Sequence, residues 1–156
     1  MATKLAFGSP DFAQQHLELY LKTDGAEGHV ADFRPIGGLE ETPCLLLKTT
    51  GRRTGKPSLL PLIYGKEGKD FVIVASKGGA PENPGWFLNL QASPEVEFQV
   101  AAKKYKGVAR VTKGDERARL FAMMDVVYPP YTSYQAKTTR EIPVVVLEPR
   151  QEIPRL

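Results

Sequence analysis

The sequence predicts an α+β domain in which about six mainly antiparallel strands form a small barrel with flanking helices. Strand-sized apolar runs follow one another from residue 44 onward, several of them in hairpin order, as an antiparallel sheet requires. Glycine and proline number 14 and 13 of 156 residues, which is typical of short strands joined by turns. A barrel is the favoured closure because it removes edge strands.

Length and composition place residues 1–156 in a single globular domain, with residues 1–40 as an N-terminal arm, helix and loop. One cysteine, Cys44, excludes an internal disulfide framework and a four-cysteine zinc site. The net charge of +3 permits an anionic ligand and is too small to demand nucleic acid. No apolar run is long enough for a membrane span or a signal peptide, so we expect a cytoplasmic protein.

The N-terminal region carries one predicted helix. Residues 1–9 look like a flexible arm, and Ser9 and Pro10 suit the N-cap and first position of a helix that runs to Lys22. The apolar residues of this helix favour packing on the core. The alternative is an amphipathic helix that rests on the inner face of the membrane. The polar segment 25–43 is predicted to be a loop.

Apolar runs between turn residues predict the strands. Residues 51–55 connect the first two, and Pro61 inside the second marks an edge or a bulge. Residues 66–69 are predicted to be a hairpin turn. The segment 95–100 alternates polar and apolar residues, which indicates one wet and one buried face. The six predicted strands cover 44–50, 57–64, 71–75, 95–100, 105–112 and 144–147.

Proline and polar residues mark the later helices. Asn83 and Pro84 suit the N-cap and first position of a short helix. The next helix covers 115–127, and two prolines end it. Thr132 and Gln135 have capping-box spacing, which predicts one more short helix.

Several kinds of catalytic machinery are missing from the sequence. The segment 51–57 is not a P-loop, because three residues rather than four separate its glycines and Pro57 replaces the hydroxyl that would hold magnesium. The spacing of His16, His29 and Cys44 matches no metal site, so we expect none. Neither GxGxxG nor GxSxG occurs. If the chain is an enzyme, a cofactor must carry the reactivity.

Five basic residues form the first constellation that could hold a cofactor: Lys48, Arg52, Arg53, Lys56 and Lys77. Hydroxyl residues and glycines beside them offer short donors and accessible backbone N–H groups, as phosphate recognition requires. These neighbours are Thr49, Thr50, Thr54, Ser76, Gly51, Gly55, Gly78 and Gly79. The alternative is a solvated hairpin tip.

Aromatic residues form two further constellations. The single tryptophan, Trp86, could pack on a flat ring while Asn89 bonds to the ring edge, although an ordinary core tryptophan is the simpler interpretation. Tyr128, Tyr131 and Tyr134 recur every third residue. They suit either a pocket wall whose phenols donate to a carbonyl or nitro oxygen, or a set of half-buried aromatics that closes one end of the barrel.

Three stretches carry a family resemblance: LLLKTTGRRTGKPSLLPLIYG, FVIVASKGGAPENPGWFLNLQASPEVEFQV and PPYTSYQAKTTREIPVVVLEP. Over about residues 43–149 the chain resembles the deazaflavin (coenzyme F420)-dependent nitroreductase and quinone reductase family. The resemblance implies a split β-barrel related to the flavin-mononucleotide-binding barrels, with coenzyme F420 as the cofactor.

The resemblance also implies roles for individual positions. The loop for the phosphate and acidic tail of F420 corresponds to Thr50, Arg52, Arg53, Thr54, Gly55 and Lys56. Residues that line the cofactor ring correspond to Pro61, Leu62, Tyr64, Ala75, Ser76, Lys77, Gly78, Gly79, Trp86 and Asn89. The substrate side, with the candidate catalytic residues, corresponds to Tyr64, Ser76, Tyr128, Tyr131 and Tyr134. Lys48 joins the cofactor set, but its place inside a strand predicts a smaller contribution.

The implied activity is hydride transfer from C5 of reduced F420 to a quinone, with nitroaromatics reduced adventitiously. A neutral tyrosine can donate to the acceptor oxygen. Three alternatives stay open: a non-catalytic F420 carrier, a flavin-mononucleotide-dependent reductase of the same barrel, and a basic nucleic-acid-binding barrel. As partners we expect a small-molecule acceptor and no nucleic acid. A homodimer and peripheral membrane contact through the N-terminal helix are both allowed.

Overall fold

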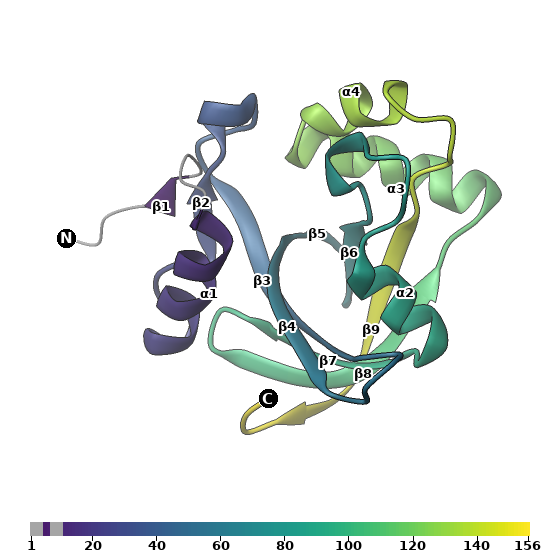
Figure 1. Cartoon of the computed structure of the whole chain (residues 1–156). Coiled ribbons are helices and arrows are strands. Elements are labelled where there is room, and N and C mark those ends of the chain that lie inside the picture. The colour runs from purple at the N-terminus through teal and green to yellow at the C-terminus, as the bar shows by residue number, and fades with distance from the viewer. Residues whose placement is uncertain (1–4, 7–10) are drawn as a thin grey trace.

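The computed structural model describes residues 5–6 and 11–156 as a curled, mainly antiparallel sheet with helices around it (Figure 1). Its strands are β1 (Leu5–Ala6), β2 (Val30–Asp32), β3 (Thr42–Thr50), β4 (Pro57–Ile63), β5 (Gly65–Glu67), β6 (Asp70–Val74), β7 (Glu95–Val100), β8 (Lys103–Val111) and β9 (Val144–Ile153). Its α-helices are α1 (Phe12–Lys22), α2 (Gly85–Ala92), α3 (Gly114–Val127) and α4 (Pro130–Ala136), with short 3₁₀ turns η1 (Arg34–Ile36) and η2 (Lys77–Gly79). The predicted α+β barrel class is confirmed.

The strands join in the order β1-β2-β3-β7-β8-β9-β6-β5, and β4 pairs with β3. The described pairings are antiparallel except β1 with β2. Pro149 is tolerated inside β9 because it lies opposite Gly107, where the register between β8 and β9 shifts. The pairing of β6 with β9 brings residues 70–74 and 144–147 together, so the loop after β6 lies near the chain segment before β9.

Two apolar clusters cover the two faces of the central strands. Phe71 and Ile73 of β6 belong to a cluster that includes Trp86 and the rest of the α2 core face. Val72 and Val74 belong to a second cluster beneath α1, α3 and α4. Successive residues of a strand point to opposite faces, so a strand buried on both faces needs an unbroken apolar run. This requirement explains the runs at 71–75 and 144–147.

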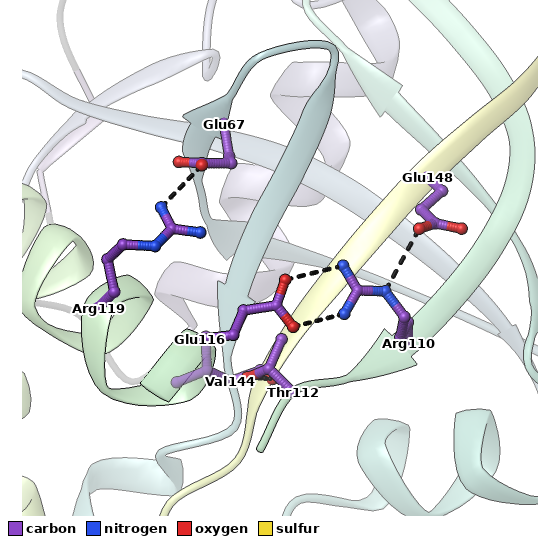
Figure 2. A network of polar contacts seen from close by, with 7 residues as sticks. All are labelled: Glu67, Arg110, Thr112, Glu116, Arg119, Val144 and Glu148. Carbon is purple, nitrogen blue, oxygen red and sulfur yellow. Dashed lines mark hydrogen bonds and ion pairs between the residues drawn. The ribbon is translucent and has the colours of Figure 1, made fainter. Parts of the chain in front are cut away.

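The helices take separate positions around the sheet. In Figure 1, α1 and α2 lie on opposite sides, and α3 and α4 lie together at one end. An ion-pair network fastens α3 to the strands (Figure 2). Arg110 of β8 donates to Glu116 at 2.6 Å and to Glu148 at 3.3 Å, and Arg119 reaches Glu67 of β5 at 2.7 Å. Among the described helices, none is long and apolar enough to cross a membrane.

Several local predictions need correction. The segment 25–43 is not wholly a loop, because it contains β2 and η1 and starts β3. Residues 66 and 67 of the predicted hairpin turn belong to β5, and the turn itself covers only Gly68 and Lys69. Nine strands are described, because β1, β2 and β5 add to the six predicted ones. Ser9 and Pro10 lie outside the described residues, as does the predicted arm apart from residues 5–6.

Two predicted helix caps are also wrong. Pro84, in an extended conformation, is the N-cap of α2, and Asn83 instead accepts a hydrogen bond from Arg140 at 2.8 Å. Thr132 does not open α4, because the helix already begins at Pro130, whose ring suits the first turn. Gln135 uses its amide oxygen to accept from Arg117 at 3.0 Å and from the Ile142 backbone at 2.9 Å.

Candidate active site

A pocket of about 590 Å³, here called the tyrosine pocket, opens where five segments meet. Its walls are α1 with η1, strand β4, the loop 76–78, the start of α2, and the segment that carries Tyr128, Tyr131 and Tyr134. Most of the lining side chains are apolar. The volume falls in the range of small-molecule and cofactor sites.

The loop after β6 gives the pocket an accessible backbone wall. Lys77, Gly78 and Gly79 all have positive φ, at 47°, 64° and 84°. A Cβ at Gly78 would meet nothing within 4 Å, and the same holds at Gly85, which also lines the pocket. A flat ring can therefore approach the backbone at both positions. Gly79 has the opposite surroundings, since a Cβ there would lie 2.7 Å from the Tyr134 carbonyl oxygen.

The three tyrosines form one aromatic group on a neighbouring wall, whose helix α4 contacts η2. The hydroxyls of Tyr128 and Tyr134 lie 2.7 Å apart, and the rings of Tyr128 and Tyr131 are 4.9 Å apart, edge to face. Burial raises the pKa of both Tyr128 and Tyr131, so these phenols stay neutral at physiological pH. The group can therefore donate hydrogen bonds to an oxygen in the pocket.

The sequence analysis did not place α1 and η1 at this site. Phe12 and His16 lie one turn apart on the buried face of α1, and Phe33 links them to Tyr128 through edge-to-face contacts of 5.8 and 5.7 Å. The apolar residues of α1 predict that one face of this helix is buried, but they do not indicate which pocket that face lines. His16 donates from Nε2 to the Gly28 carbonyl at 2.7 Å, and burial lowers its pKa.

The basic hairpin lies beyond one end of the pocket. Asn89, one helical turn after Trp86, accepts hydrogen bonds from the backbone and side chain of Arg52 at 3.2 and 3.0 Å. It donates to Thr49 at 3.1 Å, which fixes the loop against α2. A smaller hollow of about 250 Å³ borders this hairpin. Lys48 lies in that hollow and faces Glu97, 3.6 Å away.

The tyrosine pocket brings together nine of the predicted site residues: Pro61, Leu62, Ser76, Lys77, Gly78, Trp86, Tyr128, Tyr131 and Tyr134. Ser58 also lines it, two residues after Lys56, so β4 leads from the pocket to the hairpin. The predicted tail-binding residues occupy that hairpin and do not line the pocket: Lys48, Thr50, Arg52, Arg53, Thr54, Gly55 and Lys56.

Four other predicted residues do not line the tyrosine pocket. Tyr64 is buried, and its hydroxyl lies 2.7 Å from His29 Nε2, away from the pocket lining. Ala75 and Gly79 are buried beneath the loop. The carboxamide of Asn89 is already occupied by Arg52 and Thr49. Within the described residues, no group of three or more histidine, cysteine or acidic side chains is arranged to hold a metal.

The chain is similar to known proteins of one family. The family model of F420H(2)-dependent quinone reductases matches residues 14–149. An F420H(2)-dependent quinone reductase of Mycobacterium tuberculosis (strain ATCC 25618 / H37Rv) is 40% identical over 138 residues, which is 86% of this chain and 88% of that protein.

Two solved structures agree with this result. One, described as an F420-H2 dependent reductase, is 40% identical with a TM-score of 0.64, and the match covers 68% of this chain and 94% of that one. Another, described as a domain-swapped dimer, is 33% identical with a TM-score of 0.66 and covers 90% and 100%. With most of its length matched, the chain belongs to the F420H(2)-dependent quinone reductase family.

Proposed function

We propose that this protein transfers a hydride from reduced coenzyme F420 to a quinone bound in the tyrosine pocket. The observation that carries the proposal is one mostly apolar pocket of about 590 Å³ that is lined both by an open glycine backbone and by three tyrosines. Family membership supports the choice of F420 and quinone over other ligands of this shape.

The residues present fit the cofactor. Gly78 and Gly85 leave room for a flat ring, and Trp86 lines the same pocket. Arg52, Arg53 and Lys56 are exposed at the hairpin, where they would hold a phosphate and a carboxylate tail. Asn89 acts on the tail indirectly, because it fixes the Arg52 backbone and guanidinium. Bound and reduced, F420 would supply a hydride, so the chain itself needs no redox group.

The chain's own part is positioning and hydrogen bonding. The apolar walls exclude water from the acceptor. Tyr134 is half-buried and bonded to Tyr128, so it would donate to the acceptor oxygen while its neighbour supports it. Ser76, on the loop after β6, is a second donor in the pocket lining. A donor preorganised toward developing negative charge stabilises the transition state more than the bound substrate.

The finer features of the proposal concern acceptors and assembly. Nitroaromatics carry oxygens that the same phenols can bind, so we include them as adventitious acceptors. The domain-swapped relative supports a homodimer, with residues 1–156 as one cofactor-binding domain in each copy. Membrane contact is not needed to bury the apolar face of α1, since Phe12, His16 and Tyr20 already pack inside the protein.

Equilibrium titration followed by turnover tests the proposal. The purified protein is titrated with F420 and with flavin mononucleotide, and the tighter cofactor is reduced and assayed against a quinone and a nitroaromatic. We expect F420 to bind tighter and the quinone to be reduced. Tighter binding of flavin mononucleotide would favour the flavin alternative, and F420 binding without turnover would favour a carrier.

A further inference from the structure

Arg140 makes an unusual set of contacts outside the pocket lining. It lies between α4 and β9, and its guanidinium donates to four acceptors on the segment that follows β6. Nε reaches the Ala80 carbonyl at 2.9 Å, and Nη2 reaches the Ser76 carbonyl at 2.7 Å. Nη1 reaches the Ala75 carbonyl at 3.2 Å and the Asn83 side-chain oxygen at 2.8 Å. Only a planar fork with several donors can serve so many acceptors at once.

The segment that Arg140 holds is conformationally costly. Residues 77–79 all have positive φ, and Lys77, at 47°, has a side chain that disfavours this region by about 1 kcal/mol. The carbonyls of Ser76 and Ala80 flank the three residues on either side. Arg140 therefore bridges both ends of the turn that presents Ser76, Lys77 and Gly78 to the pocket.

Arg140 is itself fastened to α4, the helix that carries Tyr131 and Tyr134. Its carbonyl accepts from the Gln135 amide at 2.7 Å, and its backbone N–H donates to Thr138 at 3.3 Å. Gln135 lies on α4, one residue after Tyr134. Gly79 packs directly against the Tyr134 backbone. The guanidinium thus connects the wall with the glycine backbone to the helix with the tyrosines.

We infer that Arg140 is a positioning residue that sets the gap between the 76–78 wall and the tyrosine wall. Its role in the reaction rests on the proposed function, but its role in the pocket does not. Without the guanidinium, the Ala75 and Ala80 carbonyls and the Asn83 side-chain oxygen lose their described donor, the Ser76 carbonyl keeps only the Gly79 N–H, and Lys77 can relax to negative φ. The 76–78 segment would then shift, and its backbone would no longer be placed to contact a flat ring in the pocket.

Arg117 offers a matched control. It also has a half-buried guanidinium, and it donates to the Ile142 carbonyl at 2.7 Å and to Gln135 at 3.0 Å. These contacts join α3 and α4 to the same chain segment, and none of its described hydrogen bonds reaches residues 75–83. R117Q therefore removes a neighbouring half-buried guanidinium while leaving every described hydrogen bond from Arg140 to residues 75–83 in place.

The first measurement needs no cofactor. Trp86 is the single tryptophan and lies just after this loop, so acrylamide quenching of its fluorescence reports on the wall. In R140Q we expect the quenching constant to rise at least about twofold, and in R117Q to stay near the wild-type value, because loop opening is local. The quenching constant of R140K should lie between those of the wild type and R140Q, since a lysine ammonium cannot reach all four acceptors.

The second measurement is F420 affinity, with unfolding free energies measured for each variant. We expect R140Q to raise the Kd about tenfold and R117Q less than about twofold, by the usual relation of affinity to free energy. Equal quenching and equal Kd changes in variants of equal stability would overturn the inference. If R140Q fails to fold, R140K carries the comparison. Loss of F420 binding in the wild type would contradict the proposed function, and the quenching result would still decide the role of Arg140.

Discussion

The hydroxyl groups of Tyr128 and Tyr131 remain protonated at neutral pH because burial raises the pKa of both. Tyr134 differs from them by being half-buried, and its hydroxyl lies 2.7 Å from that of Tyr128. At the residue scale Tyr128 and Tyr131 are therefore neutral donors, and Tyr134 is joined to them through its hydroxyl. The residue types could be predicted from the sequence, but their hydrogen bonding to one another could not, because it depends on the break between α3 and α4.

Tyr134→Phe tests the donor role. We expect F420 affinity to stay within about twofold while kcat/KM for a quinone falls about 5- to 30-fold, which corresponds to about 1–2 kcal/mol. The loss is moderate because Tyr128 and Ser76 can partly substitute. Steady-state kinetics and cofactor titration of the same preparation measure both quantities. Tyr131→Phe is the control, with a smaller loss expected, and full activity in Tyr134→Phe would reduce the tyrosines to an apolar wall.

His16→Gln tests the buried histidine of α1. Burial lowers the pKa of His16. Below about pH 6.5 the His16 imidazole is therefore protonated in the unfolded chain but stays neutral in the folded chain. The contribution of neutral His16 to the free energy of unfolding is therefore complete above that pH, and it is lost as the pH falls toward the pKa of His16 in the folded chain. For one histidine the slope cannot exceed about 1.4 kcal/mol per pH unit. Urea unfolding from pH 7.5 to 5 should be less pH-dependent in His16→Gln, and an unchanged pH dependence would show that His16 titrates normally.

At the element scale, burial on both faces made β6 and the first four residues of β9 easy to predict, because it demands unbroken apolar runs, whereas the continuation of β9 to Ile153 was missed. The short strands β1, β2 and β5 were missed because two or three residues carry no periodicity. The capping interpretation of Thr132 was wrong because α4 already begins at Pro130, two residues before Thr132. Local sequence thus indicated the long elements, while tertiary pairing decided the short ones.

The contact between η2 and α4 gives a matched pair of glycine substitutions. Gly78 and Gly79 both have positive φ, but only at Gly79 would a Cβ meet the Tyr134 backbone, at 2.7 Å. We expect Gly78→Ala to cost about 1 kcal/mol of unfolding free energy and Gly79→Ala about 3 kcal/mol, since the second adds a steric overlap to the strain. Chemical denaturation measures both. Equal costs would mean that α4 is free to shift away from the loop.

The basic hairpin between β3 and β4 is tested by removing its charges. In the double variant of Arg52→Ala and Lys56→Ala we expect F420 affinity to fall about 5- to 20-fold, because exposed pairs contribute about 0.2–1 kcal/mol each and charged tails add hydrogen bonds. The effect should shrink as salt rises. Lys48→Ala is the control, with a change within about twofold, since Lys48 faces Glu97. An unaltered Kd in the double variant would move the tail site elsewhere.

At the scale of the whole molecule, the candidate site draws on segments from both ends of the chain. Family resemblance located Ser76, Trp86 and the tyrosines, and the fold places them around one pocket. The contribution of Phe12, His16 and Phe33 could not be predicted, because only tertiary packing brings α1 and η1 to this wall. Arg140 was missed for the same reason, since its acceptors lie about 60 residues earlier in the sequence.

The most direct test of the central claim is an anaerobic single turnover. The protein is loaded with one equivalent of reduced F420, mixed with excess quinone, and followed by the absorbance of oxidised F420. We expect oxidised F420 and quinol to appear in a one-to-one ratio, at a rate that Tyr134→Phe lowers about 5- to 30-fold. If reduced F420 stays reduced in the presence of the quinone, or if its oxidation is no faster than without protein, this chain is not the quinone reductase that its pocket and family indicate.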